Sequence, residues 1–367
     1  MGKKILYIVS NFRRCGPSNQ LLYLLSNLDR SVFDPSVLTL APENEDSMIH
    51  DFLELDIKIY ELKMSRKQFA FRGQSVLKSV VHKVTPDLIH SQGLRPDQAA
   101  SKIKGIPAVF TLRNDPFVDY PMKYGKMMGG WMARKHLKLA RKNPHSVLCS
   151  KSLHDGFLEK YELDIPYIQN GVDTSFYKAV AEENKASLRK KHGFNEQESI
   201  LLTVGSLLPR KDVGTLIRAI LNMKADVRLM VVGSGPMKQE LQSLAGGDRR
   251  IVFAGKQEDV RDFMHLSDLF VSASISEGLP NTLLEAMSCG LPVLLSDIPA
   301  HREIFGEGEE DVFFKISDDH ELAGKIEKML ASNLKEMGRN LRNVVEREFS
   351  AESMTKKYQE LYLKIIK

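Results

Sequence analysis

One stretch of the chain, residues 276–287, reads SEGLPNTLLEAM and places Glu277 eight residues before Glu285. A short apolar run at 269–271 precedes it and is typical of a buried strand. Pro280 and the polar residues after it predict the start of a helix, and a glycine and a proline further on predict its end. The stretch therefore predicts a strand, a loop and a helix in succession, which is the repeating element of an α/β sheet.

The start of this helix is a candidate anion site between two carboxylates. Unpaired backbone N–H groups and the helix dipole make such a start attractive to a phosphate. The residues expected around the anion are Gly278, Leu279, Pro280, Asn281 and Thr282. A diphosphate there would have Glu277 on one side and Glu285 on the other, an arrangement that suits the ribose and the sugar of a nucleotide-sugar. A capped helix with two solvent-exposed glutamates is the alternative.

Residues 277–294, EGLPNTLLEAMSCGLPVL, resemble the hallmark of the retaining family 4 glycosyltransferases of the GT-B class, in which seven residues separate two glutamates. Other matches run along nearly all of the 367 residues. The resemblance implies an α/β fold with two Rossmann-like, doubly wound domains that face a central cleft. It also implies that Glu277 holds the donor sugar and that Glu285 binds the ribose.

A second donor segment, VGSLLPRK, occupies residues 204–211 after an apolar run. Gly205 allows a ligand to approach the backbone closely, and Arg210 and Lys211 can neutralise a diphosphate. The family pattern at this place, GRLxxxKG, implies that Lys211 holds the diphosphate. Ser206 stands where the family has arginine, so we expect Arg210 to take that role. A solvent-exposed basic turn is the alternative.

Two further segments are expected on the donor side. VGSGP at 232–236 resembles the family's GxGP turn, which implies that Gly233 and Gly235 border the nucleotide pocket. It is not a dinucleotide fingerprint, because Lys238 stands at the third glycine position. Lys256 follows a segment similar to the family's F-x-G, whose backbone contacts the base.

Three residues of the N-terminal half are candidates for the acceptor side. Gly16 follows the first apolar run, where the family has a glycine-rich loop. His90 ends the segment PDLIH, although a histidine on an apolar strand is more often a core residue. Arg113 stands where the family often has a histidine that contacts the donor sugar, and arginine can bind an acidic sugar or an acceptor phosphate through two parallel hydrogen bonds. A salt bridge from Arg113 to Asp115 or Asp119 is the alternative.

The order of apolar and helix-like segments predicts the domain organisation. Strand-like runs alternate with helix-like stretches along both halves, which is typical of doubly wound parallel sheets. We expect an acceptor domain at 1–175 and a nucleotide-sugar domain at 176–348. Residues 349–367 have apolar side chains at helical spacing, and the resemblance implies that this helix crosses back onto the first domain.

Composition indicates a soluble globular protein with an uneven charge. The chain is 43% hydrophobic and 27% charged, and its three cysteines have no metal-ligand spacing, which favours a reducing compartment. No apolar run approaches the roughly 18 residues of a spanning helix, and the short run after the N-terminal lysines is better explained as a first strand than as a signal peptide.

Residues 63–142 carry 17 Lys and Arg against 4 Asp and Glu. This excess predicts either a surface for an anionic membrane or lipid-linked acceptor, or an ordinary solvated surface. No motif points to nucleic acid.

The function expected from the sequence is retaining transfer of a sugar from a nucleotide-sugar, a UDP-sugar, to a glycan or lipid-linked acceptor in lipopolysaccharide or capsule-type polysaccharide biosynthesis. The chain has no Asp-X-Asp, so we expect no metal and no cofactor, with Lys211, Arg210 and the helix start meeting the diphosphate charge. We expect a cytoplasmic protein, peripheral at the inner face of the cytoplasmic membrane. A GT-B-type nucleotide-sugar 2-epimerase and a non-catalytic sugar-nucleotide-binding subunit are the alternatives.

Overall fold

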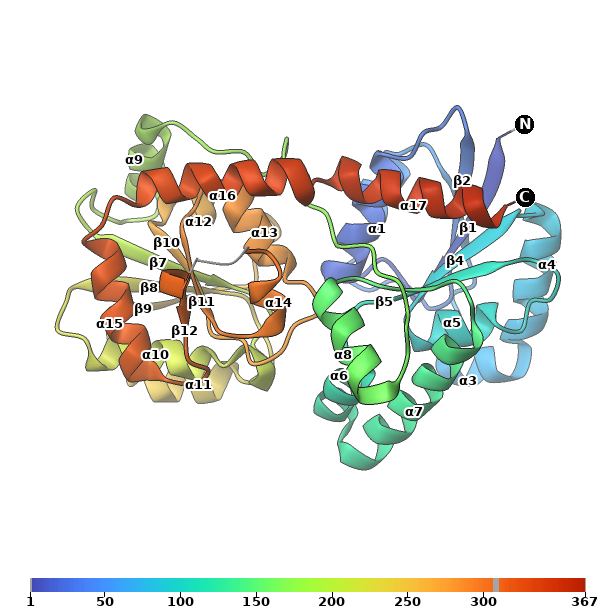
Figure 1. Cartoon of the computed structure of the whole chain (residues 1–367), viewed down its shortest axis with the longest axis horizontal. Coiled ribbons are helices and arrows are strands. Elements are labelled where there is room, and N and C mark those ends of the chain that lie inside the picture. Colours follow the sequence, from blue (N-terminus) through green and yellow to red (C-terminus); the bar gives the residue numbers. More distant parts are fainter. Residues whose placement is uncertain (1, 306–309, 367) are drawn as a thin grey trace. The chain divides into compact units, whose positions relative to one another are not determined.

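The structure, a computed structural model, describes residues 2–305 and 310–366 and divides into two compact α/β units (Figure 1). The N-terminal unit comprises Met1–Gly171 together with Ala351–Lys367, and the C-terminal unit comprises Val172–Ser350. Each unit has its own parallel sheet and its own hydrophobic core.

The N-terminal sheet has six parallel strands in the order β3-β2-β1-β4-β5-β6. These strands are β1 (Lys3–Val9), β2 (Phe33–Thr39), β3 (Lys58–Glu61), β4 (Leu88–Gln92), β5 (Ala108–Leu112) and β6 (Ser146–Leu148). The order reverses between β1 and β4, so the sheet is doubly wound and its switch point lies where these two strands end. The doubly wound parallel sheet predicted for this half from its alternating strand-like and helix-like segments is confirmed.

Helices cover the faces of this sheet and supply the connections between its strands. They are α1 (Gly16–Ser26), α2 (Ile49–Leu53), α3 (Arg66–Gln68), the π-helix η1 (Phe69–Gly73), α4 (Gln74–Val84), α5 (Leu94–Ala100), α6 (Pro116–Tyr124), α7 (Lys126–Lys142) and α8 (Lys151–Tyr161). A π-helical turn is rare and often marks a functional place in a protein. Here it joins α3 to α4 without a break.

The last helix, α17 (Ala351–Ile365), packs in the N-terminal unit (Figure 1). Met354, Tyr358 and Tyr362 lie in the core of that unit, and both tyrosines are fully buried. Their spacing puts them on one face of the helix, as the apolar pattern predicted. Burial of such a side chain stabilises the fold by roughly 1.5–3 kcal/mol, so α17 is an integral part of this unit.

The C-terminal sheet repeats the same topology, with six parallel strands in the order β12-β11-β10-β7-β8-β9. These strands are β7 (Ser199–Val204), β8 (Val227–Val232), β9 (Ile251–Gly255), β10 (Leu269–Ser272), β11 (Val293–Ser296) and β12 (Phe313–Phe314). The order reverses between β7 and β10, so the loops that follow these two strands flank the switch point. Open α/β sheets bind their ligands at such a point.

The helices of the C-terminal unit surround this sheet. They are α9 (Glu182–Lys191), the 3-10 helix η2 (Pro209–Lys211), α10 (Val213–Asn222), α11 (Lys238–Ala245), α12 (Arg261–Leu266), α13 (Asn281–Ser288), α14 (Pro299–Arg302), the 3-10 helix η3 (Glu310–Val312), α15 (Asp319–Leu330) and α16 (Leu334–Glu348). The helix predicted after Pro280 is confirmed as α13, and Gly290 follows its end with a φ of 75°.

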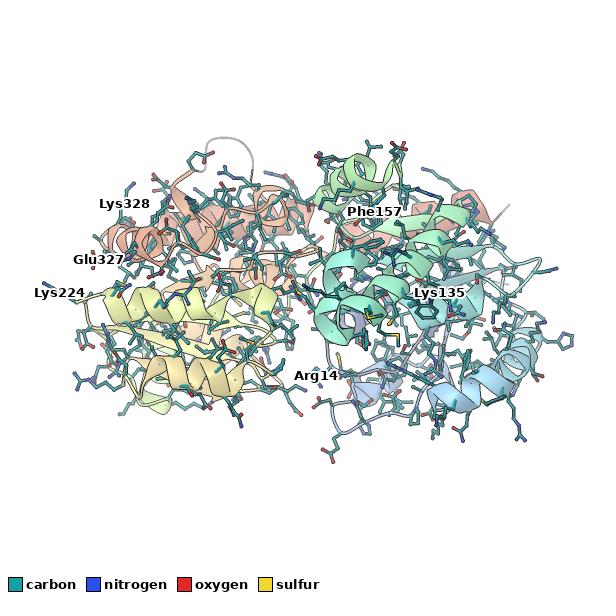
Figure 2. All side chains as sticks on the ribbon, turned by 90° about the horizontal axis from the view of Figure 1, so that it is seen from below. Arg14, Lys135, Phe157, Lys224, Glu327 and Lys328 are labelled. Carbon is teal, nitrogen blue, oxygen red and sulfur yellow. The ribbon has the colours of Figure 1, made fainter. Side chains whose placement is uncertain are left out.

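Charged side chains lie on the outside of both units and apolar side chains lie within them. Figure 2 shows Lys224, Glu327 and Lys328 at the outer edge of the C-terminal unit, and Phe157 of α8 enclosed in the N-terminal unit, where it is fully buried. Among the described residues, no helix combines the length and the apolar character that crossing a bilayer requires.

Candidate active site

The two loops at the C-terminal switch point carry a compact cluster of charged side chains. The loop after β7 contains Arg210 and Lys211, and the loop after β10 contains Ser274 and Glu277. The backbones of the two loops are joined, because the N–H of Ile275 donates to the carbonyl of Arg210 at 2.8 Å. The fold therefore brings together residues that lie more than sixty positions apart in the sequence.

Glu277 lies at the centre of this cluster and accepts bonds on both carboxylate oxygens. Arg210 Nη1 lies 2.6 Å from Oε2, and Lys211 Nζ lies 2.5 Å from Oε1. Ser274 Oγ donates to Oε1 at 2.8 Å. All three ionic side chains are mostly buried, with 6% of the Glu277 side chain and 16% of each cation exposed. One carboxylate between two cations leaves an excess positive charge, which favours an anionic ligand.

The cluster keeps Glu277 ionised. Burial alone would raise the pKa of its carboxyl group, but the charges of Lys211 and Arg210 and the hydrogen bonds from Lys211 and Ser274 outweigh burial and lower the pKa to about 2. Glu277 therefore carries a full negative charge throughout the physiological pH range.

Glu285 has the opposite environment. It lies on α13, is 4% exposed, and burial raises the pKa of its carboxyl group to about 7, although the charge of Lys211 acts in the other direction. No described residue donates a hydrogen bond to this carboxyl group. A buried acceptor of this kind suits a ligand with hydroxyl donors, such as a ribose diol.

The residues predicted at the helix start follow Glu277 directly. Gly278, Leu279 and Pro280 are buried, Asn281 and Thr282 open α13, and no side chain caps the helix at Pro280. Lys256 follows β9 and is exposed. The roles proposed for these residues in donor binding stay predictions.

Two glycine turns interlock beside the charged cluster. The N–H of Leu207 donates to the carbonyl of Ser234, and the N–H of Gly205 donates to the carbonyl of Val232, each at 3.0 Å. A Cβ atom on Gly233 would lie 1.9 Å from the carbonyl oxygen of Gly205. A Cβ atom on Gly235 would lie 2.4 Å from the carbonyl oxygen of Leu207. These glycines are thus required to hold the loop that presents Arg210 and Lys211.

Replacing Gly233 with alanine is expected to reduce the free energy of unfolding by roughly 2–5 kcal/mol, because the side chain would both clash and adopt a φ of 144°. Thermal unfolding followed by circular dichroism measures the loss. Gly246→Ala is the matched control, since Gly246 also has a positive φ of 59° but its Cβ position has no neighbour within 4 Å. Equal losses in the two variants would contradict the close approach of the two turns.

Comparison with known proteins identifies the two units. The family profile described as "Glycosyltransferase Family 4" matches residues 15–176, and the profile "Glycosyl transferases group 1" matches residues 184–346. Both profiles describe glycosyltransferases, and together they match most of the chain.

Individual relatives agree with this placement. The chain is 34% identical to the putative glycosyltransferase EpsD of Bacillus subtilis over 165 residues, which span only 43% of each chain. It is 26% identical to the O-antigen biosynthesis glycosyltransferase WclY of Escherichia coli over 98% of both chains. Among solved structures, Anabaena HepE in complex with UDP and glucose is 21% identical, with a TM-score of 0.83 and a match that covers 99% of this chain and 100% of that one. This likeness confirms the α/β GT-B fold predicted from the sequence.

The N-terminal residues predicted for the acceptor side of this glycosyltransferase occupy different environments. Gly16 is the first residue of α1, after the loop that follows β1. His90 lies instead in the core, 4% exposed, where Nδ1 is 2.6 Å from the Tyr362 hydroxyl and Nε2 is 2.8 Å from Thr111 Oγ1. Burial, with the charge of Arg113, lowers the pKa of His90 to about 3, so it is a neutral core residue. The return of the last helix to this unit was expected, but its contacts with His90 through Tyr358 and Tyr362 were not.

Arg113 lies at the end of β5 and lines a cavity of the N-terminal unit. Its Nη1 donates to Asn170 Oδ1 at 2.6 Å, and its Nε donates to Gln92 Oε1 at 3.2 Å. The alternative salt bridges are not formed, because Asp115 caps α6 and Asp119 pairs with Lys123. Arg113 thus has no carboxylate partner among the described residues.

Sequence reasoning missed two groups that support the charged cluster. Ser274 donates a hydrogen bond to Glu277, and the fully buried His301 donates from Nδ1 to the carbonyl of Ser296, 2.7 Å away. Burial lowers the pKa of His301 to about 4, so it is neutral beneath the site. Neither residue stands in a motif that marks it.

Among the described residues, no group of three or more His, Cys, Asp or Glu side chains is arranged to hold a metal ion.

Proposed function

We propose that this chain is a retaining glycosyltransferase that moves a sugar from a UDP-sugar to a glycan or lipid-linked acceptor in surface-polysaccharide biosynthesis. The observation that carries the proposal is the Glu277–Arg210–Lys211 cluster at the switch point, with the buried Glu285 on the adjoining helix. The relatives support it, since WclY acts in O-antigen biosynthesis and HepE was solved with UDP and glucose.

In the proposed reaction the acceptor oxygen bonds to the anomeric carbon on the face from which the diphosphate departs. The bond between that carbon and the diphosphate oxygen breaks, and the departing phosphate takes the acceptor proton. Lys211 and Arg210 stabilise the charge that develops on the diphosphate, without a metal ion. Glu277 positions the sugar ring. The Glu277 carboxylate also stabilises the positive charge that develops on this ring in the transition state. Glu285 binds the ribose hydroxyls.

A turnover screen tests the proposal. The chain is incubated with a panel of nucleotide-sugars, first alone to detect slow donor hydrolysis and then with candidate acceptors. Release of UDP and a product whose anomeric configuration matches the donor are the expected results. Release of a free epimerised nucleotide-sugar would contradict the proposal and indicate an epimerase. Donor binding without turnover would contradict it and indicate a non-catalytic subunit. We place the protein at the cytoplasmic face of the membrane, where nucleotide-sugars are available.

Replacing Glu285 with alanine or glutamine is expected to weaken UDP binding about ten- to a hundredfold, because a hydrogen bond to a charged group is lost. Calorimetry with UDP and with uridine measures the change. Both ligands should lose affinity by the same factor, since both carry the ribose. Unchanged affinity for either ligand would remove the ribose assignment.

The same Glu285→Gln variant is expected to be more stable than the original chain above pH 7. The folded pKa of about 7 lies above the ordinary value of 4.5, so stability falls as pH rises from 4.5 to 7, by roughly 3 kcal/mol. Glutamine removes this loss. Urea unfolding at pH 4.5 and pH 8 measures the difference, with Glu327→Gln on the exposed face of α15 as control. A difference that does not grow with pH would contradict the buried environment of Glu285.

A further inference from the structure

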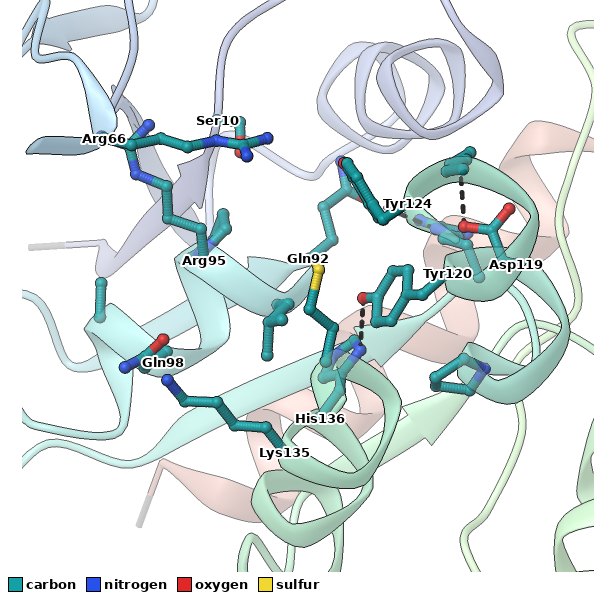
Figure 3. Close-up of a pocket in the computed structure, with 18 of the residues that line it drawn as sticks. Ser10, Arg66, Gln92, Arg95, Gln98, Asp119, Tyr120, Tyr124, Lys135 and His136 are labelled. Carbon is teal, nitrogen blue, oxygen red and sulfur yellow. Dashed lines mark hydrogen bonds and ion pairs between the residues drawn. The ribbon is translucent and has the colours of Figure 1, made fainter. Parts of the chain in front are cut away.

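A cavity of about 810 Å³ lies in the N-terminal unit at the carboxyl ends of its strands (Figure 3). Ser10 follows β1, Ala41 follows β2, and Gln92 ends β4, and all three line the cavity. Helices α3, α5, α6 and α7 and the π-helix η1 complete its wall. Its volume falls within the range of about 300–1,000 Å³ that small-molecule sites have.

The charge of the cavity wall is strongly positive. The cationic residues that line it are Arg66, Arg95, Lys102, Arg113, Lys123 and Lys135. Asp119 is the one Asp or Glu among the described lining residues, and it already accepts a bond from Lys123 at 2.8 Å. Figure 3 shows Arg66, Arg95 and Lys135 reaching the cavity from α3, α5 and α7, and none of these three pairs with a carboxylate of the described residues. The wall therefore suits an anion with several negative charges.

Arg95 gives the clearest sign of an anion site. Its Nη2 donates only to backbone carbonyls, those of Leu40 at 3.3 Å and Met64 at 3.1 Å, and its buried Nε has no partner among the described residues. Burial, and then the nearby charge of Arg66, lower the pKa of Arg95. Two guanidinium groups held close together without a carboxylate are stabilised when a phosphate binds between them.

Two elements that line the cavity carry the most exposed large apolar side chains of the described residues. Met127 is 92% exposed and Phe71 is 90% exposed, followed by Met128 and Trp131, each more than half exposed. Phe71 lies on η1 and the others lie on the first half of α7, and both elements line the cavity. Single exposed apolar residues are ordinary, but four on elements that share one cavity mark an interaction surface. We call Phe71, Met127, Met128 and Trp131 the apolar rim.

The apolar rim and the cations are combined as in surfaces that bind anionic membranes. Lys135 Nζ lies 4.8 Å from the centre of the Trp131 ring, so a positive charge accompanies the largest rim side chain. An apolar face beside Lys and Arg is typical of elements that rest in the interface of a bilayer, where tryptophan is favoured.

The far wall of the cavity is held by a buried chain of hydrogen bonds. The Tyr120 hydroxyl of α6 lies 2.7 Å from His136 Nδ1 of α7 (Figure 3), and His136 Nε2 lies 2.7 Å from Asp97 Oδ2 of α5. Ser91 Oγ donates to the other oxygen of Asp97 at 2.6 Å. This chain ties α6 and α7 to the sheet, so the cavity and the apolar rim keep a fixed relation to each other.

From these observations we infer that the cavity binds the phosphate groups of a membrane lipid that serves as the acceptor, while the apolar rim rests in the bilayer that contains this lipid. The inference rests on the proposed function and specifies its acceptor. A lipid is favoured over a free phosphate compound because the cationic wall and the apolar rim adjoin. The phosphates would lie among Arg66, Arg95 and Lys135, and the hydrocarbon chain would leave past Met127 and Trp131.

Vesicle binding tests the inference with three probes: phosphatidylcholine alone, phosphatidylcholine doped with a polyprenyl diphosphate, and phosphatidylcholine with the same negative charge supplied by phosphatidylglycerol. The diphosphate vesicles are expected to bind about tenfold more tightly than the phosphatidylglycerol vesicles, and phosphatidylcholine alone to bind least. The single tryptophan of the chain, Trp131, reports contact directly, since its emission should shift to the blue and become protected from acrylamide. Equal binding to the two charged vesicles, or an unchanged Trp131 emission, would overturn the inference.

Two pairs of substitutions separate the cavity from general surface charge. Arg66→Gln with Lys135→Gln should abolish the preference for the diphosphate vesicles. Lys67→Gln with Arg134→Gln removes the same charge from α3 and α7 at exposed residues that do not line the cavity, and should keep the preference. If the two pairs changed this preference equally, vesicle binding would depend on surface charge in general and not on the cavity, and the inference would be overturned.

The apolar rim is tested in the same way. Phe71→Ser with Met127→Ser should weaken binding to all vesicles about tenfold or more, because two exposed apolar side chains no longer enter the interface. Leu158→Ser with Leu363→Ser changes two leucines on α8 and α17 that are 48% and 47% exposed and do not line the cavity, and should have no effect. Circular dichroism checks folding.

Affinity for UDP, measured on every variant, tests the donor site separately. Vesicle binding without UDP binding would reject the proposed function but would not contradict the lipid site.

Discussion

Replacing Glu277 with glutamine is expected to lower kcat about 10²–10³-fold, while the affinity for UDP stays equal to that of the original chain or rises. The loss of turnover follows because the carboxylate is fully ionised, with a pKa of about 2, and glutamine carries no charge to stabilise the sugar in the transition state. The affinity for UDP is expected to rise because Glu277 now holds Lys211 at 2.5 Å and Arg210 at 2.6 Å. Without that carboxylate both cations are freer to bind a diphosphate.

Initial rates with saturating donor and calorimetry with UDP, on the same preparation, measure the two effects. Ser274→Ala is the matched control, since it removes one neutral hydrogen bond to Glu277 and keeps the charge. We expect it to lower kcat by less than about tenfold. A Glu277→Gln variant with full turnover would reject the catalytic role, and one that loses turnover and UDP affinity together would indicate that Glu277 is needed mainly to hold the loop.

The fold was predictable because its strands are short apolar runs between turn residues. The apolar run at 269–271 lies in β10, and α13 begins at Asn281, directly after the proline that predicted its start. Parallel strands buried on both faces need such runs, and a proline fits the first turn of a helix but not its interior. These are local effects, so a window of a few residues contains them.

The charged cluster was predictable only in part. Lys211 and Glu277 stand in motifs, and Arg210 was chosen because Ser206 stands where the family has arginine. The structure supports the choice, since Arg210 reaches Glu277 and Ser206 is exposed. Ser274 was not found, because a serine in a loop has no pattern until the loop is folded back against β7. The role of the glycines at 233 and 235 was likewise hidden, since their neighbours lie on another loop.

The cavity of the N-terminal unit was outside the reach of sequence patterns. The excess of Lys and Arg between 63 and 142 was visible, but it indicated a charged surface without naming its residues. Arg66, Arg95 and Lys135 belong to three different elements, and only the doubly wound sheet brings them to one cavity. The apolar rim was not predictable for a second reason. The identity of a methionine or phenylalanine in the sequence does not show whether the side chain is exposed or buried in the folded protein.

Replacing Lys211 with methionine is expected to lower kcat about a hundredfold and to weaken UDP binding about tenfold, while the affinity for uridine stays unchanged. Methionine keeps an unbranched stem of similar length and removes the charge. Uridine has no phosphate, so the difference between the two ligands isolates the contact with the diphosphate. Glu285→Gln should give a different pattern, because it should lower the affinity for UDP and the affinity for uridine by the same factor. Lys224→Met, at an exposed residue of the same unit, is the control and should change neither affinity.

The same experiment decides how the diphosphate charge is met. Lys211 and Arg210 supply two positive charges against the single charge of Glu277, and the start of α13 adds the partial charge of its N–H groups. If these groups act without a metal, an excess of chelator should leave the turnover of the original chain unchanged and should not deepen the loss in Lys211→Met. Turnover that disappears in chelator and returns with Mg²⁺ or Mn²⁺ would show that a metal ion carries part of the charge. Lys211 would then be a secondary contact, and its replacement should lower kcat by much less than a hundredfold.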